Sequence, residues 1–163
     1  MRLSDCIEIL ARRCGVNRGR TAAIANRLQH AGMLPLADAK RTPPELTPDD
    51  AALLLIAILA EQGVGDAAAR AAEYAAKTSP EGYRLGETIT AIMRGQIPPG
   101  SFIVREGGVS ATVNGEHVVF GAPAEDGFGR FLTTATCAAI VAEWNGAPPH
   151  RADVVRQLER ILT

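Results

Sequence analysis

The first apolar pattern in the chain predicts two helices separated by a tight turn. After Ser4, a candidate N-cap, apolar residues recur at helical spacing, at Cys6, Ile7, Leu10, Ala11 and Cys14. Gly15 is expected to end this helix, and Asn17 can cap the next one. The inward positions of that second helix are Thr21, Ile24, Ala25 and Leu28. Gly32 is expected to end the second helix.

The periodic pattern stops over residues 36–46, where Pro43-Pro44 follows Lys40-Arg41, and this composition predicts a linker. The next helix begins with the strong start signal Thr47-Pro48-Asp49-Asp50. Residues 51–60 are apolar on every side, which predicts a helix that is either central in a core or part of a subunit interface. Two more helices are expected, over about residues 66–77 and from Ser79 to about residue 94.

Residues 101–121 change to a β-favouring pattern and predict a three-stranded antiparallel meander. Asn114-Gly115 lies between two β-prone runs, and both residue types tolerate the positive φ of a tight hairpin turn. A glycine-rich loop, a helix from Arg130 to about Trp144 and a last amphipathic helix over residues 152–162 complete the chain. The expected fold class is therefore α+β, mainly α.

The charges divide the chain more sharply than its net charge of −1 indicates. Residues 1–41 hold eight Lys or Arg against three Asp or Glu, a net +5, and the remaining residues hold 9 against 15, a net −6. A basic segment joined to an acidic one favours a polyanionic partner for the basic segment alone.

Other chemistry is sparse. The three cysteines lack metal-ligand spacing and a disulfide framework, which favours a reducing, cytoplasmic compartment. No secretory signal is visible, and the longest apolar run falls short of the roughly 20 residues that span a bilayer, so no membrane partner is expected. His30, His117 and His150 are scattered, and we expect no metal, no cofactor and no enzymatic activity.

Residues 4–35 resemble the helix-turn-helix of bacterial and phage DNA-binding proteins. Ala11 takes the place of the small residue in the first helix, Gly15 that of the turn glycine and Thr21 that of the buried residue further on. The ending LQHAGMLP is similar to the close of many such segments. The sequence departs from the pattern at Thr21, where an aliphatic residue is usual, and at Gly19, which weakens the second helix by about 1 kcal/mol relative to alanine.

The resemblance implies that the second helix enters the DNA major groove. The residues it places toward the bases are Asn17, Arg18, Arg20, Ala22 and Asn26. Arginine can bind guanine with two hydrogen bonds, and asparagine can bind adenine in the same way. The residues expected to contact phosphates, which position the protein without reading sequence, are Arg12, Arg13 and Arg27.

We therefore expect a helix-turn-helix head (residues 1–35), a linker (36–46) and an α+β body (47–163) that forms a homo-oligomer through residues around 47–95. The expected function is sequence-specific binding of double-stranded DNA, as a transcriptional regulator of phage or prophage type. Two alternatives stay open. Phage terminase small subunits are similar in architecture and bind viral DNA for packaging. A non-enzymatic adaptor or inhibitor would bind another protein instead.

Overall fold

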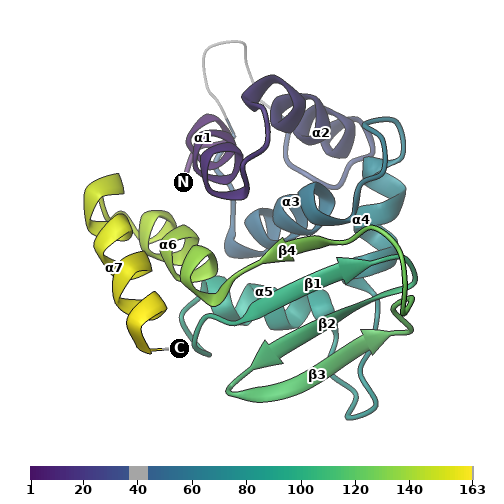
Figure 1. Ribbon diagram of the computed structural model, residues 1–163. Helices are drawn as coiled ribbons and strands as arrows, with labels where there is room; N and C mark the ends of the chain where they lie inside the picture. Colours follow the sequence, from purple (N-terminus) through teal and green to yellow (C-terminus); the bar gives the residue numbers. More distant parts are fainter. Residues whose placement is uncertain (37–43, 163) are drawn as a thin grey trace.

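The protein is described by a computed structural model over residues 1–36 and 44–162, and Figure 1 shows its helices and strands. The elements are α1 (Leu3–Cys14), α2 (Arg18–His30), α3 (Pro48–Ala60), α4 (Ala67–Ala75), α5 (Leu85–Met93), β1 (Ser101–Arg105), β2 (Gly108–Val113), β3 (Glu116–Gly121), β4 (Arg130–Leu132), α6 (Thr134–Trp144) and α7 (Pro149–Leu162). The expected α+β class, mainly helical with a small antiparallel sheet and C-terminal helices, is confirmed. None of the helices in the described ranges is long and apolar enough to cross a membrane.

Helix α3 is the centre of the fold. It begins as expected, because the Thr47 hydroxyl accepts a hydrogen bond from the Asp50 amide and the Asp50 carboxylate accepts one from the Thr47 amide. Almost every residue after this cap is buried, and α3 lies between the α1–α2 pair and the sheet (Figure 1). Residues 51–60 were predicted to be central in a core or part of a subunit interface, and in the structure they lie in the core of their own chain.

The predicted head and body share one apolar core. Leu10 of α1 and Ile24 and Leu28 of α2 belong to the same cluster of buried side chains as Leu54 and Ile58 of α3. Most of the predicted linker, residues 36–46, lies outside the described residues. At its C-terminal end, Leu46 is buried, and its amide donates a hydrogen bond to the carbonyl of Met1. The orientation of α1 and α2 is thus set by packing against the rest of the chain.

The sheet is antiparallel with strand order β3-β2-β1-β4. Asn114 and Gly115 have φ values of 53° and 80°, so the predicted hairpin turn is confirmed. One face of the sheet is buried against the helices through side chains that alternate along the strands, namely Phe102, Val104, Val109, Ala111, Phe120 and Leu132.

Several predicted boundaries were wrong, each for a local reason. Residues 130–132 are not the start of a helix but strand β4, which pairs with β1, and α6 starts only after Thr133, whose hydroxyl accepts from the Thr136 amide. The helix expected from Ser79 begins at Leu85, because a turn with Gly82 at φ 90° comes first. Ser4 does not cap α1, which begins one residue earlier.

Replacing Gly108 by alanine is expected to lower the free energy of unfolding by about 2 kcal/mol, the middle of the range for forced overpacking. A Cβ atom at Gly108 would lie 2.4 Å from the Phe120 carbonyl oxygen and 2.7 Å from the Pro123 nitrogen, both of them backbone atoms. Urea denaturation measures the change. Gly63→Ala is the control, because a Cβ there meets no atom within 4 Å; equal effects of the two substitutions would contradict the prediction.

Candidate nucleic-acid interface

The turn between α1 and α2 has the geometry that the sequence predicts. Gly15 has φ 67°, a left-handed conformation that glycine adopts without steric cost, and the Val16 amide donates to the Ala11 carbonyl. Asn17 caps α2: its Oδ1 accepts from the amides of Gly19 at 2.8 Å and Arg20 at 3.4 Å. The Asn17 side chain therefore orients the start of α2.

The inward face of α2 is also as expected, since Thr21, Ile24, Ala25 and Leu28 are all buried. Thr21, the departure from the usual aliphatic residue, is accommodated because its hydroxyl donates to the Asn17 carbonyl at 3.2 Å. A buried hydroxyl with a partner costs little, so this residue does not disturb the helix pair.

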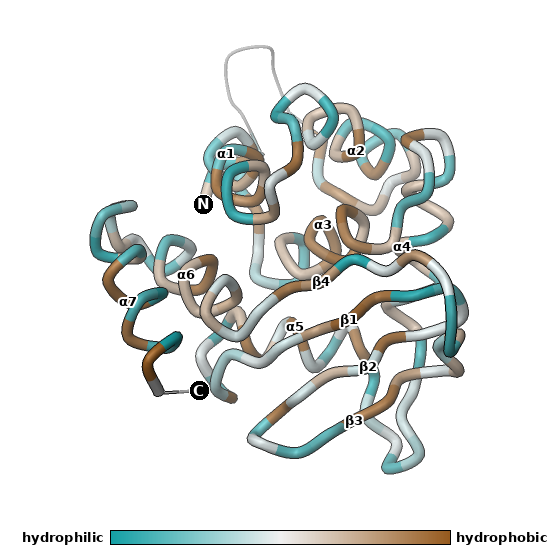
Figure 2. The backbone as a smooth tube through the Cα atoms, viewed as in Figure 1, coloured by the Kyte–Doolittle hydropathy of each residue, from teal (hydrophilic) through white to brown (hydrophobic). Residues whose placement is uncertain are grey.

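The outward face of α2 is basic and polar, and α2 contains no acidic residue. Arg18, Asn26 and Arg27 are exposed and Ala22 is half-buried. Figure 2 shows hydrophilic residues along the outer turns of α2. Within the described ranges, no ion pair is formed by Arg27.

Arg18 forms an ion pair with Glu8 of α1, in which both side chains are more than half exposed. Exposed pairs of this kind contribute only about 0–1 kcal/mol, because water screens the charges and long side chains lose entropy. Arg18 can therefore leave Glu8 for a stronger anion at small cost.

Arg20 is held quite differently, by the buried carboxylate of Glu61 at the end of α3. Its Nε and Nη2 each donate to one oxygen of Glu61 at 2.9 Å, and Nη2 of Arg130 from β4 donates to the same carboxylate at 2.7 Å. Burial acts to raise the pKa of Glu61, but the hydrogen bonds and charges of the two guanidinium groups outweigh it and lower that pKa. Arg20 thus anchors α2 to the body of the fold.

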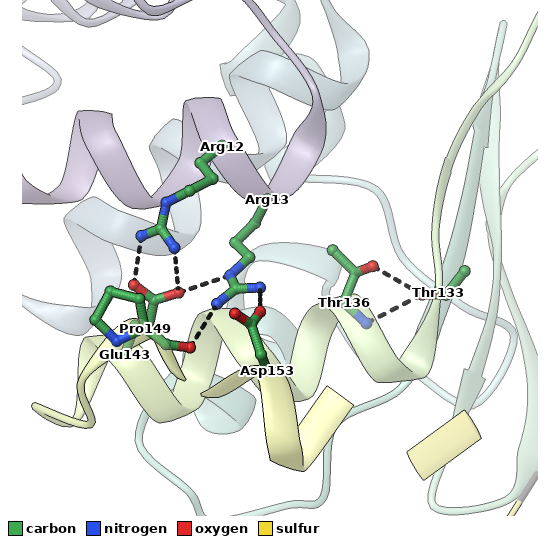
Figure 3. A network of polar contacts seen from close by, with 7 residues as sticks. All are labelled: Arg12, Arg13, Thr133, Thr136, Glu143, Pro149 and Asp153. Carbon is green, nitrogen blue, oxygen red and sulfur yellow. Dashed lines mark hydrogen bonds and ion pairs between the residues drawn. The ribbon is translucent and has the colours of Figure 1, made fainter. Parts of the chain in front are cut away.

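Arg12 and Arg13 join α1 to α6 and α7 (Figure 3). Arg12 donates to both oxygens of Glu143, at 3.2 and 2.6 Å. Arg13, whose side chain is 3% exposed, donates to Glu143 at 2.6 Å, to Asp153 at 2.5 Å and to the Pro149 carbonyl at 3.3 Å. This burial removes Arg13 from the expected phosphate contacts, and Arg12 is engaged by the same carboxylate.

The structure thus divides the eight predicted DNA-contacting residues into two groups. The side chains of Arg12, Arg13, Asn17 and Arg20 are bound by other groups of the chain. Arg18, Asn26 and Arg27 are exposed, with Arg18 in its exposed pair with Glu8, and Ala22 is half-buried and packs against the core. The acidic partners Glu61, Glu143 and Asp153 were not predicted from the sequence. A signal existed for two of them, because Glu61 ends an apolar helix and Glu143 interrupts another.

The cysteines are free thiols without a metal-binding arrangement. Burial raises the pKa of Cys6 and Cys14 to about 12, so both are protonated at neutral pH. In the part of the chain that the structure describes, no group of His, Cys, Asp and Glu side chains could hold a metal ion.

Comparison with known proteins adds no relative: the chain matches no protein-family model, no curated protein and no solved structure.

Proposed function

We propose that the protein binds double-stranded DNA with α2 in the major groove and acts, as a homo-oligomer, as a transcriptional regulator. The observation that carries the proposal is that Arg18, Asn26 and Arg27 are exposed on α2, a helix that lacks acidic residues and follows a turn of helix-turn-helix geometry. Gly19, which is exposed and lacks a side chain, lets the start of α2 approach a phosphate closely.

The roles we assign follow from how each side chain is held. Arg18 and Asn26 contact base edges, Arg18 by exchanging the weak pair with Glu8 for the acceptors of guanine. Arg27 contacts a phosphate. Arg20 and Asn17 act indirectly, because they fix the start of α2 against Glu61 and its own backbone amides. DNA binding therefore depends on few charges, and its salt dependence should be correspondingly modest.

Selection from a randomised duplex pool, followed by fluorescence anisotropy on the selected duplex, tests this function. The double variant Arg18→Ala, Arg27→Ala is expected to bind at least tenfold more weakly and with a salt dependence lower by about one to two charges. Asn26→Ala is expected to relax the preference at one base position rather than to weaken binding to all duplexes.

Arg84→Ala is the matched control, because Arg84 is an exposed arginine at the start of α5, away from α2. It should bind DNA as the wild type does. Absence of duplex binding at low salt would overturn the proposal, as would a double variant that binds like the Arg84→Ala control.

A further inference from the structure

Strand β3 is the last strand at one edge of the sheet (Figure 1). The amide of Gly121, at the end of β3, donates a hydrogen bond outward to the carbonyl of Thr78. Because backbone groups alternate in direction along an antiparallel ladder, those of Val119 and His117 point to the same outer side. Within residues 1–36 and 44–162, neither of these two residues forms a backbone hydrogen bond with a group outside the sheet. The edge is therefore closed at Gly121 and open at His117 and Val119.

A pocket of about 280 Å³ lies beside this open edge, between β3 and α5. One wall is formed by Val118 and Phe120 of β3, and the other includes Thr88 and Ala91 of α5. Ile97, which follows α5, adds to the apolar lining. A free strand edge with a pocket for alternate side chains is the arrangement that receives an added peptide strand. The pocket and the edge together form a groove, which we call the β3–α5 groove.

We infer that the β3–α5 groove binds an extended segment of a partner protein, which adds antiparallel to β3. Every strand pair of the sheet is antiparallel, and parallel pairing is slightly less stable. The partner residue opposite Val118 has its side chain on the same face as Val118, so it enters the pocket. The residues before and after it lie opposite Val119 and His117 and exchange both main-chain hydrogen bonds with them. The edge thus holds the peptide, and the pocket selects a large apolar side chain.

The charges of the groove specify the partner further. Glu116 is exposed at the open end of β3, opposite the partner residue that comes two positions after the apolar one. Glu87 of α5 adds a second exposed carboxylate to the lining, and neither forms an ion pair within the described ranges. Arg84, which also lines the pocket, pairs with Thr78 and so lies toward the closed end. Opposite charges across two strands attract, so the partner carries a lysine or arginine opposite Glu116.

A second copy of the chain does not supply this pattern. Strand β3 contains no lysine or arginine. If two β3 strands paired with Val118 opposite Val118, Glu116 would face Phe120 of the second copy, which is fully buried in its own chain. The occupant is therefore a segment of another protein, in which a large apolar residue is followed two positions later by a basic one. This inference goes beyond the proposed function and does not rest on it, because the groove is formed by β3 and α5 and not by α2.

Fluorescence anisotropy with a labelled peptide tests the inference on the full chain, without DNA. The probe is fluorescein-labelled Ser-Thr-Leu-Thr-Lys-Ser with blocked ends, whose leucine is designed for the pocket and whose lysine is designed for Glu116. We expect saturable binding. Replacing the leucine of the peptide by alanine should weaken binding about tenfold or more, because the pocket then buries less apolar surface.

Methylation of single peptide nitrogens distinguishes strand addition from filling of the pocket alone. The amides of the two threonines face β3, so a methyl group on either should weaken binding about tenfold or more. The amide of the leucine points away from β3, so a methyl group there should leave the affinity nearly unchanged. These comparisons use the unaltered protein, so they do not depend on the folding of a variant.

Reversing one charge tests the predicted pair with the lysine. Glu116→Lys should weaken binding of the probe on the order of fivefold, and a peptide with glutamate in place of its lysine should recover the affinity for this variant. Glu106→Lys is the matched control, because Glu106 is an exposed glutamate in the turn between β1 and β2. Circular dichroism checks that both variants fold.

Four results would overturn the inference. They are no binding of the probe at the highest soluble protein concentration, equal binding of all the methylated peptides, equal effects of Glu116→Lys and Glu106→Lys, and a dimer in light scattering that Glu116→Lys dissociates. The second result would mean that the pocket takes a ligand without strand addition, and the last that a second copy covers the edge. Because no titration contains DNA, a failure of the proposed DNA binding is a separate result.

Discussion

Replacing Glu143 by alanine is expected to lower the free energy of unfolding by about 3–5 kcal/mol, the range found when one partner of a buried ion pair is removed. The Glu143 carboxylate, 4% exposed, is the acceptor for both Arg12 and Arg13. Without it, the guanidinium of Arg13 stays in a site where its side chain is 3% exposed and is left with only Asp153 and a carbonyl.

The size of this effect comes from leaving the Arg13 guanidinium buried without its acceptor, and less from losing the attraction between Arg13 and Glu143. Taking a guanidinium out of water is costly, and the carboxylate offsets that cost only while it is in place. A variant that removes both charges, Arg13→Met with Glu143→Leu, should therefore recover much of the lost stability, because the site then holds apolar side chains of similar volume.

Urea denaturation of the three proteins measures the prediction, with Asp153→Ala as the matched control. Asp153 binds the same guanidinium but is exposed, so water can replace it and the loss should be much smaller. If Glu143→Ala and Asp153→Ala lowered stability by the same amount, Arg13 would not be the buried charge that the structure describes.

Local signals in the sequence predicted much of the fold. The turn at Gly15, the cap at Asn17, the capping residues Thr47 and Asp50 and the hairpin at Asn114 all depend on residues within a few positions of one another. Strand β4 was missed because its three residues are too few to show a period, and it exists only through pairing with β1.

Charge pairing could not be predicted in the same way, because it joins distant parts of the chain. Arg13 and Glu143 are separated by 130 residues, and Arg20 and Glu61 by 41. In the sequence alone, these arginines count as positive charge available to a polyanion. In the structure, arginines of the basic head form ion pairs with glutamates of the acidic body. Among the arginines of α2, Arg18 and Arg27 remain with little or no such pairing to the body and are exposed.

These ion pairs within the chain hold the candidate interface in place. The two clusters, around Glu61 and around Glu143, fix α2 and α1 to different parts of the body, to α3 and β4 in the first case and to α6 and α7 in the second. A helix held at its start by Arg20 and Asn17 presents its outward side chains in one orientation, and preorganised side chains lose less entropy on binding. The network thus supports the proposed DNA binding, although none of its ion pairs is itself proposed to contact DNA.

Replacing Glu61 by alanine is expected to destabilise the protein by about 3 kcal/mol at neutral pH. The Glu61 side chain is fully buried, and its removal leaves Arg20 and Arg130 without their shared acceptor. The loss should lie at the lower end of the range for buried pairs, because both arginines are partly exposed and can turn toward water. Urea denaturation measures it, and the more conservative Glu61→Gln serves for the pH series.

The lowered pKa of Glu61 fixes how this effect depends on pH. A carboxylate whose pKa is lower in the folded than in the unfolded state stabilises the fold above the unfolded value of about 4.3, and this contribution is lost as the pH falls through the folded pKa. The stability difference between wild type and Glu61→Gln should therefore be largest near neutral pH and shrink on acidification below about pH 5. Glu116→Gln, at an exposed glutamate on β3, should run parallel to wild type throughout. A stability difference between wild type and Glu61→Gln that instead stays constant as the pH falls below about 5 would contradict this prediction. That result would show that Glu61 contributes by shape and packing, and not as the charged acceptor that holds α2 in place.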